Sequence, residues 1–336
     1  MLNVAVAGAS GYTGAELCRL ISSHPGLKLA GIFVSALSQD QGKALSELYG
    51  SLATRVELKL RPLHDPEELL SCGAQAVFLA TDHKVSHDLA PALVKGGCRV
   101  FDLSGAFRLK DPAVFARYYG FEHQHPELLE HAVYALAEFT TQEELRRASV
   151  IALPGCYPTA SQLALKPLLD RGLLERSFRP VINAVSGVSG SGRKAKLASS
   201  FCEVSLNAYG VFTHRHLPEI TSRLGMEVIF NPHLGSFKRG ILATITARLV
   251  PGTTAEAVRE AYESAYAHKP LIRLKQSLPR LQDVQGLPFC DLGWQCGPDG
   301  YIVICSAIDN LLKGAAAQAL QVLNLHYGYP ETAGLF

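Results

Sequence analysis

The apolar positions at the start of the chain predict a strand, a turn and a helix in that order. Residues 2–7 form a short and almost entirely apolar run that breaks at Gly8. In the segment that follows, the apolar residues Leu17, Leu20 and Ile21 recur at helical spacing. We therefore expect a buried strand that passes through a glycine turn into a helix.

The alternation of strand and helix continues through the first half of the chain. The apolar pattern predicts three more strands and one more helix, the strands at residues 29–34, 76–80 and 99–103 and the helix at residues 85–95. Strands that alternate with helices are typical of a doubly wound parallel sheet. We therefore expect a Rossmann-type α/β domain over residues 1–150.

After residue 150 the pattern becomes mixed. A helix is expected after Cys156, and strands are expected at residues 181–185, 240–250 and 301–305. A final helix is expected over residues 310–325. These elements indicate a second, α+β domain over residues 151–309, with residues 310–336 joining the first domain.

Length and composition agree with two domains and exclude several kinds of partner. A chain of 336 residues is longer than a single core usually accommodates, and its hydrophobic share of 48% suffices for two. The formal net charge is +2 and no run of Lys or Arg is present, so no nucleic-acid role is expected.

No membrane role is expected either. The chain begins without a basic segment, and no apolar stretch approaches the roughly 18–20 residues that a membrane span needs. The 8 cysteines are scattered, with no CxxC pair and no compact spacing with histidine. This pattern indicates reduced thiols in a cytoplasmic protein, and no metal site is predicted.

Cys156 is the first candidate for chemistry. It stands in the stretch LPGCYPTASQLALKPLLDRG, where Pro158 favours the first turn of a helix whose apolar positions follow. The free N–H groups and the positive end of the helix dipole would stabilise a thiolate there. Cys156 is therefore either a nucleophile or a small buried apolar residue.

The glycine turn after the first strand is a candidate cofactor site. Gly8, Gly11 and Gly14 in GASGYTG form a variant of the dinucleotide fingerprint, together with Ser10, Tyr12 and Thr13. Glycines let the backbone approach a pyrophosphate, whose charge then lies at the helix N-terminus. The position of this turn, directly between a strand and a helix, favours nucleotide binding over a plain structural turn.

The end of the second strand indicates which cofactor binds. NAD sites usually carry Asp or Glu there, whereas this chain has Ser35 and Ser38 with Lys43 nearby. Hydroxyls and a lysine are suited to a 2′-phosphate, so we expect NADP(H). Lys43 could equally be an ordinary surface lysine.

A histidine-rich segment offers a proton donor and acceptor. In VFTHRHLPEI, His216 precedes Glu219 by three residues, so the carboxylate could orient the imidazole if the segment is helical. A surface pair is the alternative. His214 could also be the base, and it is a candidate contact to the substrate.

Two further segments could bind anions. The stretch SGVSGSGRK supplies backbone N–H groups, hydroxyls and a guanidinium suited to a phosphate or carboxylate. Ser186, Ser189, Gly190 and Arg193 are its candidates for the substrate, and Gly187 is its candidate for the cofactor. Arg108, in FDLSGAFRL, follows a strand and would lie near the carboxyl edge of the sheet. A flexible loop and a structural arginine are the respective alternatives.

Taken together, several segments resemble the N-acetyl-gamma-glutamyl-phosphate reductases, arginine-biosynthesis enzymes related to the aspartate-semialdehyde dehydrogenases. The segments are GASGYTGAEL, FDLSGAFR, PGCYPTA, SGVSGSGRK, FTHRHLPEI and DNLLKGAAAQALQ. The pair PGCYPTA and HRHLPEI is the most specific, whereas GASGYTG is shared with many dehydrogenases. The resemblance extends along essentially the whole chain.

The resemblance implies a reaction and its residues. Cys156 would be the nucleophile, His216 the acid/base, and Asn310 a contact to the nicotinamide carboxamide. The substrate would be N-acetyl-L-glutamyl 5-phosphate, reduced by NADPH through a thioester with release of phosphate. The second domain would be catalytic and would form a homodimer or homotetramer.

Two alternative functions remain open. One is a related reductase that acts on an aspartyl phosphate or a carrier-linked aminoadipyl phosphate. The other is a non-catalytic NADP-binding regulator in which Cys156 is structural.

Overall fold

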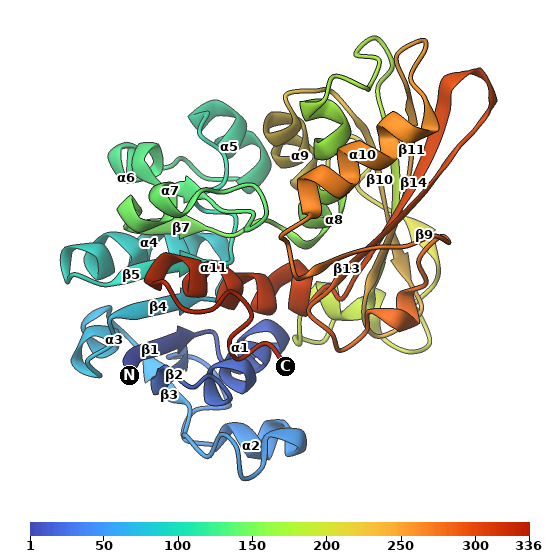
Figure 1. Cartoon of the computed structure of the whole chain (residues 1–336). Coiled ribbons are helices and arrows are strands. Elements are labelled where there is room, and N and C mark those ends of the chain that lie inside the picture. Colours follow the sequence, from blue (N-terminus) through green and yellow to red (C-terminus); the bar gives the residue numbers. More distant parts are fainter. The chain divides into compact units, whose positions relative to one another are not determined.

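The computed structural model describes all residues, 1–336, and contains two compact units (Figure 1). Unit 1 comprises residues 1–155 and 315–336, and unit 2 comprises residues 156–314. The sequence prediction placed the divisions at 150/151 and at about 310.

Unit 1 is built on a seven-stranded, all-parallel sheet in the order β3-β2-β1-β4-β5-β7-β6. Its strands are β1 (Leu2–Ala7), β2 (Leu27–Ser35), β3 (Arg61–Leu63), β4 (Ala76–Leu79), β5 (Arg99–Asp102), β6 (Val133–Tyr134) and β7 (Val150–Ala152). The order runs outward from β1 in both directions, which is the doubly wound arrangement. The predicted fold class is therefore confirmed.

The helices of unit 1 lie in two groups. They are α1 (Tyr12–Ser22), α2 (Leu45–Leu48), α3 (Glu67–Ser71), α4 (His83–Lys95), α5 (Pro112–Tyr119), α6 (Pro126–His131), α7 (Gln142–Arg147) and α11 (Ala317–Tyr327). Helix α11 packs against α1 and α7, whereas α3 packs against α4. Because right-handed crossovers on the two sides of β1 place their helices on opposite faces, the sheet is covered on both. The four residues of β4 are accordingly all buried.

Unit 2 contains a seven-stranded mixed sheet in the order β12-β13-β14-β11-β8-β10-β9. Its strands are β8 (Val181–Gly187), β9 (Asn207–Ala208), β10 (Ile229–Gly235), β11 (Ile241–Arg248), β12 (Ile272–Leu274), β13 (Cys290–Cys296) and β14 (Tyr301–Ile308). Helices α8 (Cys156–Asp170), α9 (His216–Leu224) and α10 (Ala255–Tyr266) lie on one side of this sheet (Figure 1).

The burial pattern of unit 2 agrees with a sheet covered on one face. Ile241, Ala243 and Ile245 of β11 are buried, whereas the alternating Leu242 and Thr244 are half-buried. Since successive side chains of a strand point to opposite faces, the second face of this sheet is only partly covered within the chain.

Two predicted helix starts need correction. Helix α8 begins at Cys156 itself and not after it. The final α-helix begins at Ala317 and not near residue 310, because a wide π-helical turn, Leu312–Ala316, precedes it. The carboxylate of Asp309 accepts the backbone N–H groups of Leu311 and Leu312, which holds the start of that turn.

No helix in the structure is long and apolar enough to cross a membrane.

Candidate active site

The glycine turn of unit 1 has no room for side chains. Gly8 has φ +82°, and a Cβ there would collide with the backbone carbonyl of Ala80. A Cβ on Gly14 would collide with the carbonyl of Gly8 and would lie 2.7 Å from the Cα of Ala9. These two positions require glycine because the backbones of β1, β4 and α1 meet at this turn.

The N-terminus of helix α1, which follows this turn, is suited to binding an anion. Its N-cap is Gly11, which offers no side-chain cap, and its first turn contains no acidic residue. Ser10, Tyr12 and Thr13 beside it are half-buried. Uncapped N–H groups at the positive end of a helix dipole suit a phosphate, so this cradle fits the pyrophosphate of a dinucleotide.

The loop after β2 contains a carboxylate that the sequence reasoning did not weigh. Lys43 Nζ lies 3.0 Å from Asp40 Oδ1. Ser35 Oγ accepts the N–H of Leu37, and Ser38 Oγ accepts the N–H of Asp40. Of the three residues predicted to hold a 2′-phosphate, Ser35 ends β2, and Ser38 and Lys43 lie in the loop that follows, where Lys43 is paired with Asp40.

In unit 2, one cavity of about 580 Å³ gathers six of the residues that the sequence singled out. These are Cys156, Ser186, Gly187, Gly190, His214 and His216. The sequence reasoning missed other residues that line the cavity, namely Tyr157, Ser191, Lys196, Ala198, Glu203, Asn207, Tyr209, Arg215 and Leu234. Among the missed residues, Lys196 and Arg215 add positive charge to a cavity that already holds a thiol and two imidazoles.

Cys156 is the first residue of α8 and is half-buried. The first turn of α8 contains no acidic residue, so the positive end of the helix dipole acts on the thiol unopposed. Burial raises the pKa of the thiols of Cys98 and Cys305, which lie outside the cavity. Among these cysteines, Cys156 alone combines a helix N-terminus with access to a cavity.

Gly314 packs closely against the nucleophile candidate. A Cβ at this position would lie 2.9 Å from the Cβ of Cys156 and 3.2 Å from the Cδ1 of Ile308. The N–H of Gly314 donates to the carbonyl of Asp309 at 2.9 Å, which is the five-residue hydrogen bond that defines a π-helical turn. The wide turn therefore places a residue without a side chain beside Cys156.

The two histidines of the cavity have different environments. His216 is buried and is the first residue of α9, one helical turn before the fully buried Glu219. His214 precedes the helix, and its Nδ1 accepts the backbone N–H of His216 at 3.1 Å. Burial, assisted by the charge of Arg215, lowers the pKa of His214 to about 4. His214 is therefore neutral at neutral pH.

Tyr157 and Tyr209 form a second wall of the cavity. Their hydroxyl oxygens lie 3.3 Å apart, and the Tyr157 hydroxyl also donates to the carbonyl of His233 at 3.1 Å. Burial raises the pKa of both phenols, so both stay protonated. This pair links the start of α8 to the chain beside β9 and β10.

Asn310 holds the glycine-serine segment in place. Its Oδ1 accepts the N–H of Gly240 at 2.6 Å, and its Nδ2 donates to Ser189 Oγ at 3.0 Å. The backbone of Gly187 is equally constrained, since a Cβ there would lie 2.6 Å from the nitrogen of Arg239. Ser189 and Asn310 thus contact each other, and neither of them lines the cavity.

The two predicted arginines differ in burial. Arg108 is buried, and its guanidinium donates to the carbonyls of Leu153 at 2.7 Å and Leu103 at 2.8 Å. It thereby ties together the chain after β5 and the chain after β7. Arg193 is exposed. Neither residue lines the cavity in unit 2.

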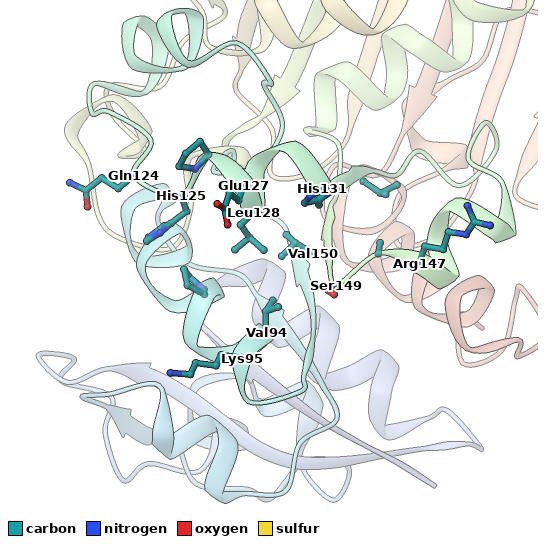
Figure 2. Close-up of a pocket in the computed structure, with 14 residues that line it drawn as sticks. Val94, Lys95, Gln124, His125, Glu127, Leu128, His131, Arg147, Ser149 and Val150 are labelled. Atoms are coloured by element: carbon teal, nitrogen blue, oxygen red, sulfur yellow. The ribbon is translucent and has the colours of Figure 1, made fainter.

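A second cavity, of about 890 Å³, lies in unit 1 and is lined by none of the predicted residues (Figure 2). Lys95 and Arg147 on its wall lie in the last turns of α4 and α7, and His131 ends α6. Cations in these positions stabilise the negative ends of the helix dipoles, which accounts for them without a ligand.

One group of side chains in unit 1 has the composition of a metal site. Ligand atoms of His87, Asp88 and His125 lie within 4.8 Å of one another. His87 Nε2 accepts the N–H of Gln124 at 3.0 Å, so the ring proton is on Nδ1 and points to Asp88 Oδ1 at 2.7 Å. Both nitrogens of His87 are therefore engaged, and this geometry does not support a metal ligand.

Two family models together match most of the chain. The family model described as semialdehyde dehydrogenase, NAD binding domain, matches residues 3–148. The model described as semialdehyde dehydrogenase, dimerisation domain, matches residues 156–310.

Close relatives carry one name. An N-acetyl-gamma-glutamyl-phosphate reductase of Vibrio parahaemolyticus is 56% identical over 336 residues, which is 100% of both chains. The proteins of that name from Yersinia pseudotuberculosis and Escherichia coli O6:H1 are 57% and 56% identical, again over 100% of both chains.

Solved structures share the fold at low identity. Aspartate semialdehyde dehydrogenase II of Vibrio cholerae, complexed with ASA, has a TM-score of 0.73 at 16% identity and covers 98% of both chains. Aspartate semialdehyde dehydrogenase of Candida albicans, with NADP, has a TM-score of 0.71 at 15% identity and covers 97% of this chain and 98% of that one.

Proposed function

The chain belongs to the N-acetyl-gamma-glutamyl-phosphate reductase family of semialdehyde dehydrogenases, and we propose a reaction course for it in which Cys156 forms a thioester. The protein is an oxidoreductase of arginine biosynthesis that converts N-acetyl-L-glutamyl 5-phosphate to the 5-semialdehyde. One observation carries the proposed course: a thiol at a helix N-terminus shares a cavity with a buried histidine.

The cofactor of this reaction is a nicotinamide dinucleotide, and we propose NADP(H). The cradle formed by Gly8, Gly11 and Gly14, with the neighbouring Ser10, Tyr12 and Thr13, would hold the pyrophosphate. Ser35, Ser38 and Lys43 would hold the 2′-phosphate, for which Lys43 would leave Asp40. When bound, the nicotinamide supplies the hydride that reduces the acyl carbon.

Cys156 begins the reaction. Its thiolate, stabilised by the N-terminus of α8, attacks the acyl carbon of the acyl phosphate. The bond from carbon to the phosphate oxygen breaks, inorganic phosphate leaves, and a thioester remains on Cys156. The free N–H groups of the first turn can donate to the oxyanion that develops in this step.

His216 completes the reaction by moving one proton. It donates the proton to the oxygen of the reduced thioester, which gives a thiohemiacetal. It then takes the hydroxyl proton back as the C–S bond breaks, which releases the semialdehyde and returns Cys156 as the thiolate. Glu219, buried one turn later on the same helix, would hold the imidazole in orientation.

Cationic and hydroxyl groups of the cavity would bind the substrate's anionic groups. We propose Ser186, Gly190, Lys196 and Arg215, which all line the cavity, for this role. It stays a prediction that Arg108, Ser189, Arg193 and His214 contribute to substrate binding. It also stays a prediction that Gly187 and Asn310 contact the cofactor.

The protein forms an oligomer, for which we propose a homodimer or homotetramer. The half-buried residues of the second face of the unit 2 sheet, such as Leu242 and Thr244, offer a surface for a second copy. A cytoplasmic location stays a prediction.

The test is the reverse reaction. Purified protein should reduce NADP with N-acetyl-L-glutamate 5-semialdehyde only when phosphate is added, and Cys156→Ala should abolish this activity. Activity on aspartate semialdehyde alone would point to the related reductases. A folded protein that binds NADPH and reduces nothing would instead be a regulator.

A further inference from the structure

We propose that His214 is a positioning residue that holds the start of α9, and with it His216, through the hydrogen bond from the His216 N–H to His214 Nδ1. This inference rests on the proposed function, in which His216 moves the proton. It assigns the two cavity histidines, which the sequence could not tell apart, to separate tasks.

Helix α9 has no side-chain cap at its N-terminus. The N-cap residue is Arg215, whose side chain makes no capping hydrogen bond. The first N–H groups of a helix have no partner within the helix. The N–H of His216 is satisfied by the ring of His214 at 3.1 Å. The ring therefore replaces the missing cap at the residue that carries the proposed acid/base.

The ring of His214 is held on several sides. A tight turn precedes it, in which the N–H of His214 donates to the carbonyl of Gly210 at 2.8 Å. The ring is then packed edge-to-face against Tyr157, Tyr209 and Phe230, with centroid distances of 5.5–5.8 Å. An imidazole held on several sides and bonded to the chain ahead of it has little freedom to turn.

The hydrogen bond from His216 fixes the protonation state of His214. Because Nδ1 accepts an N–H, it carries a lone pair, and the single proton of the neutral ring is on Nε2. Protonation of Nδ1 would break the bond to His216. Burial and the charge of Arg215 lower the pKa of His214, so the bond persists at neutral pH. Cycling a proton at Nδ1 is incompatible with capping, which leaves the proton transfer to His216.

Two substitutions at this position separate the two ring nitrogens. Asn places its amide oxygen near the position of Nδ1, where it can accept the same N–H, whereas Gln places its amide near Nε2. We expect His214→Gln to lower kcat by roughly 10- to 100-fold, and His214→Asn to recover it to within about threefold of the wild type. The apparent KM for N-acetyl-L-glutamate 5-semialdehyde should change less than kcat in both.

The kinetic test has a defined failure. The acid limb of the pH dependence of kcat should be the same in the Asn variant and the wild type, because His214 does not titrate in the cycle. Equal losses in the Asn and Gln variants, or an acid limb that moves in the Asn variant, would overturn the proposal.

His123 of unit 1 provides a matched control. Its Nδ1 accepts the N–H of His125 at 3.2 Å, the same bond across the same two-residue spacing, and burial lowers its pKa to about 4. His123→Asn and His123→Gln should change the melting temperature and leave kcat unchanged. A kcat effect of Gln at both positions would indicate general destabilisation and overturn the positioning role.

A measurement without turnover keeps the proposal separate from the proposed function. In protein with ¹⁵N-labelled histidine, the signal lost in the His214→Asn variant should report a bare Nδ1 and a protonated Nε2 from pH 8 to about pH 5. A ring that titrates between about pH 6 and 7 would contradict the proposal, even in a protein that proved inactive on every acyl phosphate.

Discussion

The N-termini of α1 and α8 use the same backbone device for different chemistry. Each helix follows a strand after a short loop that contains glycine, and neither has an acidic residue in its first turn. In α1 the turn excludes side chains at Gly8 and Gly14, and in the proposed function its N–H groups are left for the charge of a bound pyrophosphate. In α8 the first residue is Cys156, so the same groups act on a charge that the helix itself carries. In the proposed function, one arrangement thus serves binding where the side chain is absent and catalysis where it is a thiol.

The largest expected effect is a loss of NADPH affinity when a side chain is added at the glycine turn where α1 begins. Gly14→Ala places a methyl group 2.7 Å from the Cα of Ala9, so α1 must shift away from β1. The Kd for NADPH, measured by fluorescence titration, should rise by roughly 100-fold. Gly11→Ala is the matched control, because its new Cβ would lie 3.4 Å from the nearest atom outside its chain neighbours. A melting temperature for Gly11→Ala that is similar to the wild type, together with a loss of NADPH affinity only in Gly14→Ala, would support the comparison between the two N-termini. An equal rise of the Kd for NADPH in both variants would contradict it.

The thiol at the start of α8 provides the next test. With limiting iodoacetamide at pH 7, Cys156 should be alkylated about tenfold faster than Cys202, which is exposed but does not begin an α-helix. Peptide mapping by mass spectrometry gives both rates in one sample. If Cys156 reacts no faster than Cys202, the helix does not activate the thiol, and the parallel between the two N-termini is lost.

A smaller effect is expected at the loop after β2. Lys43→Ala should raise the Kd for NADPH by about fivefold and leave that for NADH unchanged, because only NADPH carries the 2′-phosphate. Asp40→Asn should act in the opposite direction, since it releases Lys43 from its ion pair. A matching loss of NADH affinity in Lys43→Ala would assign the lysine to loop structure.

The sequence predicts the strands at the centre of the unit 1 sheet, β1, β2, β4 and β5, for a physical reason, whereas it misses the short strands β3, β6 and β7. Buried parallel strands such as β4 are continuous apolar runs, and glycines end them. In unit 2 two of the missed strands, β10 and β13, contain residues that usually interrupt strands. Pro232 lies within β10, and β13 includes Asp291, which is fully buried and bonded by Arg273 Nε at 2.5 Å. Whether a sheet can hold such a residue depends on its neighbours in the folded chain, as the bond from Arg273 to Asp291 shows, and local sequence does not reveal those neighbours.

The candidate site likewise contains residues that the local sequence reveals and residues that it does not. Cys156 leaves a local signal in the sequence because Pro158, two residues later, favours the first turn of a helix. His216 leaves one because Glu219 follows it at helical spacing. Lys196 and Tyr209 leave none. They reach the cavity because β8 and β10 pair in parallel and β9 pairs with β10, which brings distant loops together. Pairing of this kind depends on long-range register, which local periodicity does not encode.

The close contact of Gly314 with Cys156 has a consequence for the mutational landscape of the gene. Every missense change at codon 314 adds at least a methyl group where 2.9 Å separates the new Cβ from the Cβ of Cys156. In a library selected for growth without arginine, codon 314 should therefore be as intolerant as codon 156, although Gly314 contributes no functional group. Depletion at that codon would reflect shape alone, so sensitivity to substitution at this site does not identify a reacting residue.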